Sequence, residues 1–138
     1  AMFLHGMTYS GHPVASAAAL ANIALMERDQ IPQRVRLTGK RFENNLRGLE
    51  SLDLVGEVRG SHFMMGIEFV KDKEKKTPFE PEDQIGLKVS RSAQNRGLIA
   101  RPLGNILILS PTLIMTEEQI DRTSDILRES IIEVQTAS

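Results

Sequence analysis

The sequence predicts an α+β domain: a small antiparallel sheet with helices packed on one face, preceded by a long alanine-rich helix. Apolar residues recur at helical spacing in several segments, whereas they alternate with other residues in a central segment. The predicted strands come in neighbouring pairs and do not alternate regularly with helices, which favours an antiparallel sheet in a two-layer domain. The 138 residues suit a domain of this size.

The first predicted helix covers about residues 12–29. Pro13 suits the first turn of a helix, where its missing N–H leaves no hydrogen bond unmade. Small residues follow in the run "VASAAALA", so other elements could approach this helix closely on more than one side. We therefore expect the helix to be buried in a larger assembly.

The second predicted helix covers about residues 31–52, and its two faces differ. One stripe is apolar and is formed by Ile31, Val35, Phe42, Leu46 and Leu49. The opposite face is charged and predicted to be solvated; it carries Arg34, Lys40, Arg41, Glu43 and Arg47. We expect residues 1–30 to form a loop segment and a connecting helix, and residues 31–138 to form the small α+β domain.

The remaining elements follow from alternation and turn signals. Residues 63–70 alternate as in a strand, and the six charged residues 71–76 indicate an exposed connection. A third helix is expected over residues 81–96, and two short strands surround the turn "PLGN". The capping-box pattern "TEEQ" opens a final helix. Its predicted buried stripe is Ile120, Leu127, Ile131 and Val134.

Composition excludes several classes of function. The chain has 17 basic and 18 acidic residues in mixed clusters, so we expect neither nucleic acid nor a membrane as a partner. It has no cysteine, which excludes thiolate chemistry and disulfides and is compatible with a cytoplasmic location. Its three histidines do not have the spacing of a helical metal site, and no metal is expected. The chain enters the motif "HGMTYSGHP" without a preceding element, which indicates a fragment.

The motif "HGMTYSGHP" has two interpretations that the residues leave open. Thr8, Tyr9 and Ser10 carry hydroxyl donors, and Gly6 and Gly11 let backbone N–H groups come close to a ligand. The following helix would direct its positive end toward this loop, as in a phosphate site. However, no Lys or Arg lies nearby, and a serine or glycine that caps a buried helix is the simpler explanation.

Two arginines lie in predicted strands. Arg101, in "IARPLGN", could pair with an internal carboxylate or receive the carboxylate of a substrate, and the internal pair is favoured when the residues are considered alone. Arg59, in "VRG", faces the same choice, and a structural role is favoured for it as well.

The segments "FLHGMTYSGHPVASAAALANIALME", "VRG", "GIEF", "RGLIARPLGN" and "LSPTLIMTEEQID", in this order, resemble a known family. They are similar to the C-terminal third of class III pyridoxal-phosphate-dependent aminotransferases, the omega-aminotransferase group. This resemblance implies fold type I, a homodimer, and an active site built at the subunit interface. The chain departs from the family pattern Arg-Gly-x-Gly at His62, and from Pro-Pro-Leu at Thr112.

The resemblance also implies roles for individual residues. Thr8, with Tyr9, would bind the cofactor phosphate of the neighbouring subunit, and Met7 would line the partner's substrate pocket. Arg101 would receive a substrate carboxylate and swing aside for an apolar substituent. The cofactor would be pyridoxal 5′-phosphate, and the substrates a small-molecule amine and a keto acid.

The resemblance places the lysine that forms the Schiff base in a large domain ahead of residue 1. None of the six lysines of this chain lies in a suitable motif, so it supplies no catalytic residue and we expect it to be inactive alone and not to retain the cofactor. Two alternatives stay open. The chain could be a non-catalytic dimerisation module, or part of a pyridoxal-phosphate enzyme of another type, such as an aminomutase or decarboxylase.

Overall fold

The computed structural model describes residue 3 and residues 5–137. Its contacts divide the chain into two compact units, residues 1–32 and residues 33–138. We refer to them as the first and the second unit and describe each by itself.

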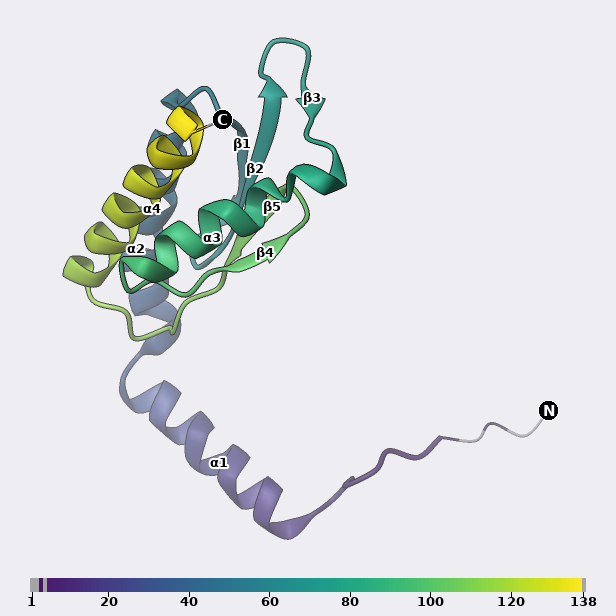
Figure 1. Cartoon of the computed structure of the whole chain (residues 1–138). Coiled ribbons are helices and arrows are strands. Elements are labelled where there is room, and N and C mark those ends of the chain that lie inside the picture. Colours follow the sequence, from purple (N-terminus) through teal and green to yellow (C-terminus); the bar gives the residue numbers. More distant parts are fainter. Residues whose placement is uncertain (1–2, 4, 138) are drawn as a thin grey trace. The chain divides into compact units, whose positions relative to one another are not determined.

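In the first unit, the described residues 5–12 lead into the helix α1 (Pro13–Arg28) (Figure 1). The helix was predicted over nearly the same residues. Pro13 occupies its first turn, and His12 caps it by accepting a hydrogen bond from the Ala15 N–H at Nδ1, 3.3 Å away. The cap is therefore a histidine and not the serine or glycine of the simpler interpretation. None of the described residues of α1 is buried.

The second unit contains the sheet and the remaining helices. Its elements in chain order are α2 (Ile31–Arg47), the 3-10 helix η1 (Gly48–Ser51), β1 (Val55–Ser61), β2 (Met64–Asp72), β3 (Thr77–Pro78), the 3-10 helix η2 (Pro81–Asp83), α3 (Ile85–Asn95), β4 (Arg101–Leu103), β5 (Ile106–Leu109) and α4 (Glu117–Ala137). The helix α2 begins in the last two residues of the first unit.

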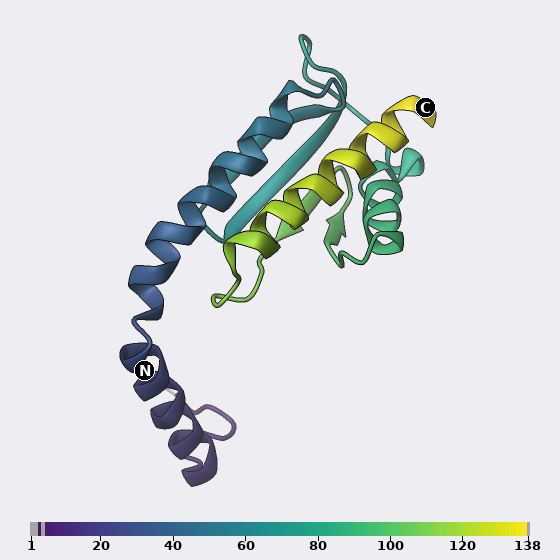
Figure 2. The ribbon, with the colours of Figure 1, turned by 90° about the vertical axis from the view of Figure 1, so that its left-hand side faces the viewer.

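All strand pairs in the described part of the sheet are antiparallel. The strand order is β1-β2-β5-β4, and β3 pairs with the C-terminal end of β2, at Val70 and Asp72. Figure 2 shows α2 and α4 side by side across the sheet. Arg41 of α2 joins them because its guanidinium donates hydrogen bonds to both carboxylate oxygens of Asp121 in α4, at 2.9 and 2.6 Å. The predicted α+β class is confirmed.

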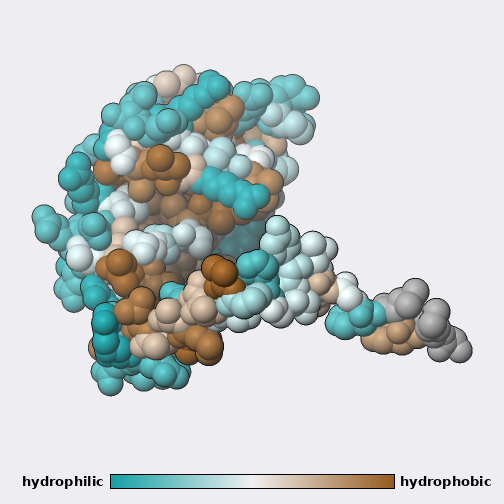
Figure 3. All heavy atoms as spheres, turned by 90° about the horizontal axis from the view of Figure 1, so that it is seen from below, coloured by the Kyte–Doolittle hydropathy of each residue, from teal (hydrophilic) through white to brown (hydrophobic). Residues whose placement is uncertain are grey.

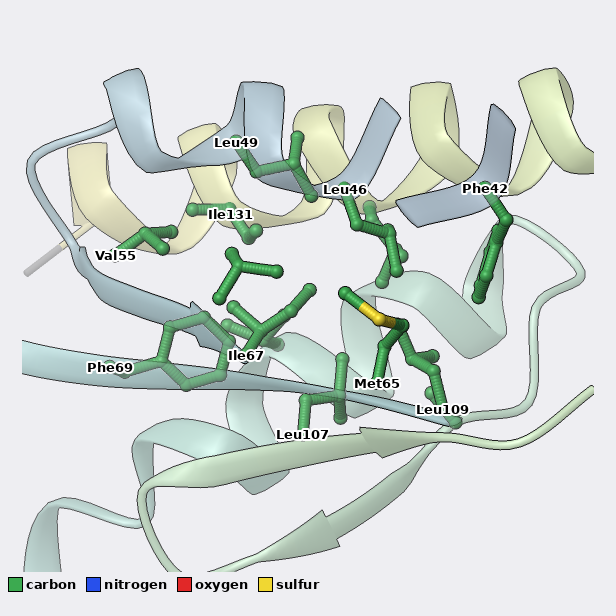
Figure 4. Packing of buried hydrophobic residues seen from close by; sticks show 14 of the residues in the cluster. Phe42, Leu46, Leu49, Val55, Met65, Ile67, Phe69, Leu107, Leu109 and Ile131 are labelled. Atoms are coloured by element: carbon green, nitrogen blue, oxygen red, sulfur yellow. The ribbon is translucent and has the colours of Figure 1, made fainter. Parts of the chain in front are cut away.

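The core lies between these helices and the sheet. Figure 4 shows Phe42 and Leu46 of α2, Leu49 of η1 and Ile131 of α4 pointing toward the sheet, whose strand β2 carries Ile67 and Phe69. All six side chains are completely buried. The buried stripe predicted for the final helix is also confirmed, since Ile120, Leu127, Ile131 and Val134 all belong to this core. Full burial of a large apolar side chain contributes about 1.5–3 kcal/mol, so these residues dominate the stability of the second unit.

Many apolar side chains remain at the surface, and Figure 3 shows them in brown among hydrophilic residues. In the first unit they include Val14, Leu20 and Ile23; in the second they include Leu37 and Ile99, which is 88% exposed. Apolar surface of this kind is typical of a chain that contacts other protein. No helix in the described part of the chain is long and apolar enough to cross a membrane.

The third helix was predicted to begin at residue 81, which is too early. Residues 81–83 form the separate 3-10 helix η2, and α3 begins only at Ile85. Gln84 between them has a left-handed backbone conformation, with φ of 48°, which breaks the helical path. Glu80 and Asp83 form a reciprocal capping box, so η2 has its own capped N-terminus.

The charged segment 71–76 was predicted as an exposed connection, but its first two residues continue β2. The connection is a tight hairpin, because Thr77 pairs with Asp72 across it. Asp72 accepts a hydrogen bond from the Lys75 N–H at 3.0 Å and forms an ion pair with the Lys75 ammonium at 3.2 Å. These two contacts between Asp72 and Lys75 stabilise the turn.

Glu43 also differs from the prediction, because it is buried and does not lie on a solvated face. Its carboxylate accepts hydrogen bonds from the His62 N–H at 3.2 Å and from the Arg47 guanidinium at 3.1 and 3.2 Å. The His62 N–H, followed by Arg47, lowers the pKa of Glu43 below its ordinary value. His62 has φ of 52°, so the position where the resembling family has glycine is a left-handed one.

Candidate functional site

The segment from Met7 to His12 folds into two successive turns. The Ser10 N–H donates to the Met7 carbonyl and the His12 N–H donates to the Tyr9 carbonyl, each at 3.1 Å. Tyr9 and Gly11 have φ of 66° and 71°. A non-glycine residue in this left-handed region costs on the order of 1–3 kcal/mol, and such strain is concentrated at functional sites.

This turn presents free hydrogen-bond donors. Among the described residues, neither the Thr8 hydroxyl nor the N–H groups of Thr8, Tyr9 and Gly11 have an acceptor. A side chain at Gly11 would meet no atom within 4 Å, so the loop is open on that side. Thr8, Tyr9 and Met7 are all exposed. These neutral donors fit an anionic group that is bound from outside the chain.

The turn supplies no positive side chain. The first basic residue of the sequence is Arg28, at the far end of α1. The start of α1 adds a partial positive charge, but the His12 ring already occupies the Ala15 N–H. Thr8 and Tyr9 therefore fit a phosphate as contributors of neutral hydrogen bonds, and the neutralising cation has to come from elsewhere.

Arg101 is the first residue of β4, which is an edge strand of the sheet. Its backbone pairs with Ile108 of β5, and its side chain is exposed. The guanidinium has no ion pair or hydrogen bond with any described residue. The internal carboxylate partner favoured from the residues alone is thus not seen in the described part of the chain, and all donors of Arg101 are available.

Arg59 shows the opposite behaviour. Its guanidinium lies 3.1 Å from a Glu57 oxygen and also forms a close ion pair with Glu68 on the neighbouring strand. The hydrogen bond to Glu68 is the main reason why the pKa of Arg59 is raised above its ordinary value. The structural role predicted for Arg59 is confirmed.

A pocket of about 360 Å³ opens beside Arg101. Its walls are mostly apolar side chains, and four of these are buried: Phe42, Ala100, Leu109 and Met115. Thr123 of α4 also lines it, and sequence reasoning assigned this residue no role. No sequence signal distinguishes Thr123 from the other hydroxyl residues of α4; only its position at this pocket does.

A larger hollow of about 670 Å³ lies between α3 and the end of α4 and is lined in part by charged groups. Its two carboxylates already have partners: Asp83 pairs with Lys71 at 2.9 Å, and Glu133 pairs with Arg96 at 2.6 Å. Lys88 and Arg91 also line this hollow, but neither lies in a motif that the sequence singled out, so we place the candidate site at Arg101.

The lysines of this chain are all at the surface. Lys40, Lys71, Lys73, Lys75, Lys76 and Lys88 lie on α2, on β2 and its hairpin, and on α3, and each is exposed. In the described residues no group of three or more His, Cys, Asp or Glu is placed to hold a metal ion. Thr8, Tyr9 and Met7 share one turn of the first unit, whereas Arg101 belongs to the second unit.

Comparison with known proteins identifies the family. The model of the aminotransferase class-III family matches residues 1–131. An uncharacterised aminotransferase, y4uB, of Sinorhizobium fredii is 45% identical over 86% of this chain and 26% of its own length. The adenosylmethionine-8-amino-7-oxononanoate aminotransferase of Methanocaldococcus jannaschii is 40% identical over 94% of this chain and 28% of its own length.

Solved structures agree with this result. The crystal structure of the Methanocaldococcus jannaschii enzyme matches with a TM-score of 0.90 over 95% of this chain and 30% of that chain. The PMP-bound aminotransferase from Vibrio fluvialis matches with a TM-score of 0.90 and 38% identity, over 98% of this chain and 30% of that chain.

The fold and the matches define an aminotransferase-type domain. This chain belongs to the class III aminotransferases, a family that uses pyridoxal phosphate, and it spans less than a third of the length of these relatives.

Proposed function

We propose that this chain is the C-terminal part of a longer, homodimeric cytoplasmic aminotransferase of the omega-aminotransferase group, which we refer to as the parent protein. The parent protein would transfer an amino group from an amine or amino acid to a keto acid. Pyridoxal phosphate, when bound, supplies the electron-withdrawing ring that this exchange requires. The observation that carries the proposal is the unpaired Arg101 at the edge of the sheet in a chain of this family.

In this proposal Thr8 and Tyr9 position the cofactor phosphate of the neighbouring subunit. The Thr8 hydroxyl and the free N–H groups of Thr8 and Tyr9 would donate hydrogen bonds to phosphate oxygens. Met7, exposed in the same turn, would border the substrate pocket of that subunit. The lack of a cation in this turn fits a phosphate that is shared with a subunit bringing its own positive charge.

Arg101 would bind the carboxylate of the keto acid or amino acid. A guanidinium matches a carboxylate with two parallel hydrogen bonds, and a free, exposed guanidinium can turn away when the substrate carries an apolar group instead. Neither Thr8 nor Arg101 would form or break a covalent bond; both hold reacting molecules in place.

The experiment compares substrates with and without a carboxylate in the parent protein. Replacing Arg101 with Gln should raise the KM for a keto acid at least tenfold, since about 1.5–3 kcal/mol is typical of a hydrogen bond to a charged group. The KM for an uncharged amine should change less than twofold. Arg36→Gln, which removes an exposed and unpaired arginine of α2, is the control. Equal effects of Arg101→Gln on both substrates would contradict the assignment.

A second candidate function is a non-catalytic association module, and the exposed apolar surface of α1 favours it. Val14 is 72% and Leu20 68% exposed, which is costly for a helix in water. In this case the chain alone should self-associate, and Leu20→Glu should give monomers in sedimentation analysis. The parent protein would then keep its cofactor when Thr8 is replaced.

A further inference from the structure

The pocket beside Arg101 has the size and walls of a small-molecule site. Its volume of about 360 Å³ lies within the usual range of roughly 300–1,000 Å³ for such sites. Phe42 is completely buried, and Leu109 and Met115 are 5% and 8% exposed, so the walls are held in place by the core. Its mostly apolar lining favours a ligand with an apolar part.

One buried polar group in this pocket lacks a partner. Thr123 is 7% exposed, and its hydroxyl forms no hydrogen bond with any described residue. Its neighbour Ser124 behaves differently, because its hydroxyl donates to the Ile120 carbonyl at 3.0 Å. No fully enclosed side-chain nitrogen or oxygen of the described residues is unpaired, so the Thr123 hydroxyl borders open space, which is the pocket.

The Thr123 hydroxyl lines the pocket and is free to form a hydrogen bond with a ligand that enters it. Arg101 adds an unpaired cation at the same pocket. Apolar walls, an inner hydroxyl and a free guanidinium together suit an amphipathic anion.

We propose that this pocket binds the apolar chain or ring of a carboxylic acid whose carboxylate is held by Arg101. The inference rests on the proposed role of Arg101 and extends it, because it assigns the substrate's apolar body to the second unit itself. Keto or amino acids with a long apolar side chain are then preferred over short ones. Thr123 would donate to, or accept from, a polar atom on that body.

The test uses the 138-residue chain with labelled methyl groups, titrated in NMR with octanoate, acetate and 1-octanol. Acetate has the carboxylate without the chain, and 1-octanol has the chain without the carboxylate. We expect octanoate to bind at least tenfold more tightly than acetate and to shift the methyl resonances of Leu98, Leu109 and Met115. Arg101→Gln should weaken octanoate at least tenfold and leave 1-octanol unchanged, whereas Arg36→Gln should change neither.

A second variant occupies the pocket. Thr123→Met places a longer side chain into the open space and should abolish the shifts caused by octanoate. Thr123→Val, whose side chain is nearly the same size as that of threonine, is the variant to measure if the methionine variant does not fold. The valine variant should keep octanoate in the pocket but should no longer favour a 3-hydroxy acid of equal length over octanoate.

The outcomes separate the two proposals. If acetate and octanoate bind equally and both depend on Arg101, the pocket proposal is overturned while the carboxylate role of Arg101 stands. If octanoate fills the pocket but Arg101→Gln has no effect, the carboxylate role fails and the proposal fails with it. Octanoate shifts confined to residues outside the pocket overturn the pocket proposal as well.

Discussion

Gly86 lets α3 pack directly on the turn between β4 and β5, and replacing it tests this packing. A Cβ atom at Gly86 would lie 2.4 Å from the Gly104 carbonyl oxygen and 3.3 Å from the Ile106 carbonyl oxygen. Ordinary contact begins at about 3.4 Å, so the helix and the turn must separate by about 1 Å. Both neighbours are backbone atoms, and no side-chain rotation can relieve the clash.

The expected effect of Gly86→Ala is a loss of stability. Overpacking costs about 1–3 kcal/mol, and the gain in helix propensity from glycine to alanine returns at most about 1 kcal/mol. Because both clashing atoms are backbone, we expect the cost to lie at the upper end of this range, and a net loss of about 2 kcal/mol corresponds to a fall of at least about 4 °C in Tm for a domain of this size. The measurement is thermal and urea unfolding followed by far-UV circular dichroism.

The matched control is Gly48→Ala in η1. A Cβ atom there would lie 3.7 Å from Arg128 Nη2, which is ordinary contact. Its stability should equal that of the unchanged chain or exceed it. If Gly86→Ala is as stable as Gly48→Ala, α3 does not pack tightly against the β4–β5 turn. The conclusion that α3 supports β4, the strand that carries Arg101, would then be wrong.

Three further predictions follow from the second unit and from the family. A Cβ atom at Gly39 would lie 2.7 Å from the His62 Cβ, so Gly39→Ala should lower the free energy of unfolding by about 1–3 kcal/mol. This loss should largely disappear when His62 is also replaced with glycine. A double-mutant cycle that shows no coupling between the two positions would contradict the contact. The lowered pKa of Glu43 stabilises the fold above the ordinary carboxyl pKa of 4.5, and this contribution is lost as the pH falls below that value. Urea unfolding between pH 6 and pH 3 should therefore show a smaller acid loss for Glu43→Gln, and identical losses would count against the buried carboxylate. Finally, the isolated chain with pyridoxal phosphate, alanine and a keto acid should transfer no amino group; measurable turnover would refute its expected inactivity.

The elements with strong periodicity could be predicted from the sequence. The apolar stripes of α2 and α4 identify their buried faces because helical spacing alone decides which side chains meet the sheet. The break at Gln84 could not be predicted, since a left-handed glutamine is determined by the capping of the turn before it. Glu43 was misassigned because its partner, the His62 N–H, is 19 residues away and belongs to the β1–β2 turn.

The candidate site was only partly predictable for a similar reason. Thr8 and Arg101 lie in recognisable motifs, whereas the absence of a partner for Arg101 depends on where every described carboxylate lies in the folded chain. Arg59, which also lies in a strand, is paired because β1 and β2 bring Glu57 and Glu68 to it. The Thr123 hydroxyl and its pocket exist only in three dimensions.

The central claim is that this chain contributes phosphate contacts to a site completed by a neighbouring subunit. The most direct measurement is the affinity of the parent protein for pyridoxal phosphate after Thr8→Val, with Ser10→Ala in the same turn as the control. We predict at least a tenfold loss of affinity for Thr8→Val, because a hydrogen bond to a charged group is worth about 1.5–3 kcal/mol, and less than a twofold change for Ser10→Ala. An unchanged affinity in Thr8→Val would contradict the claim and favour the association module.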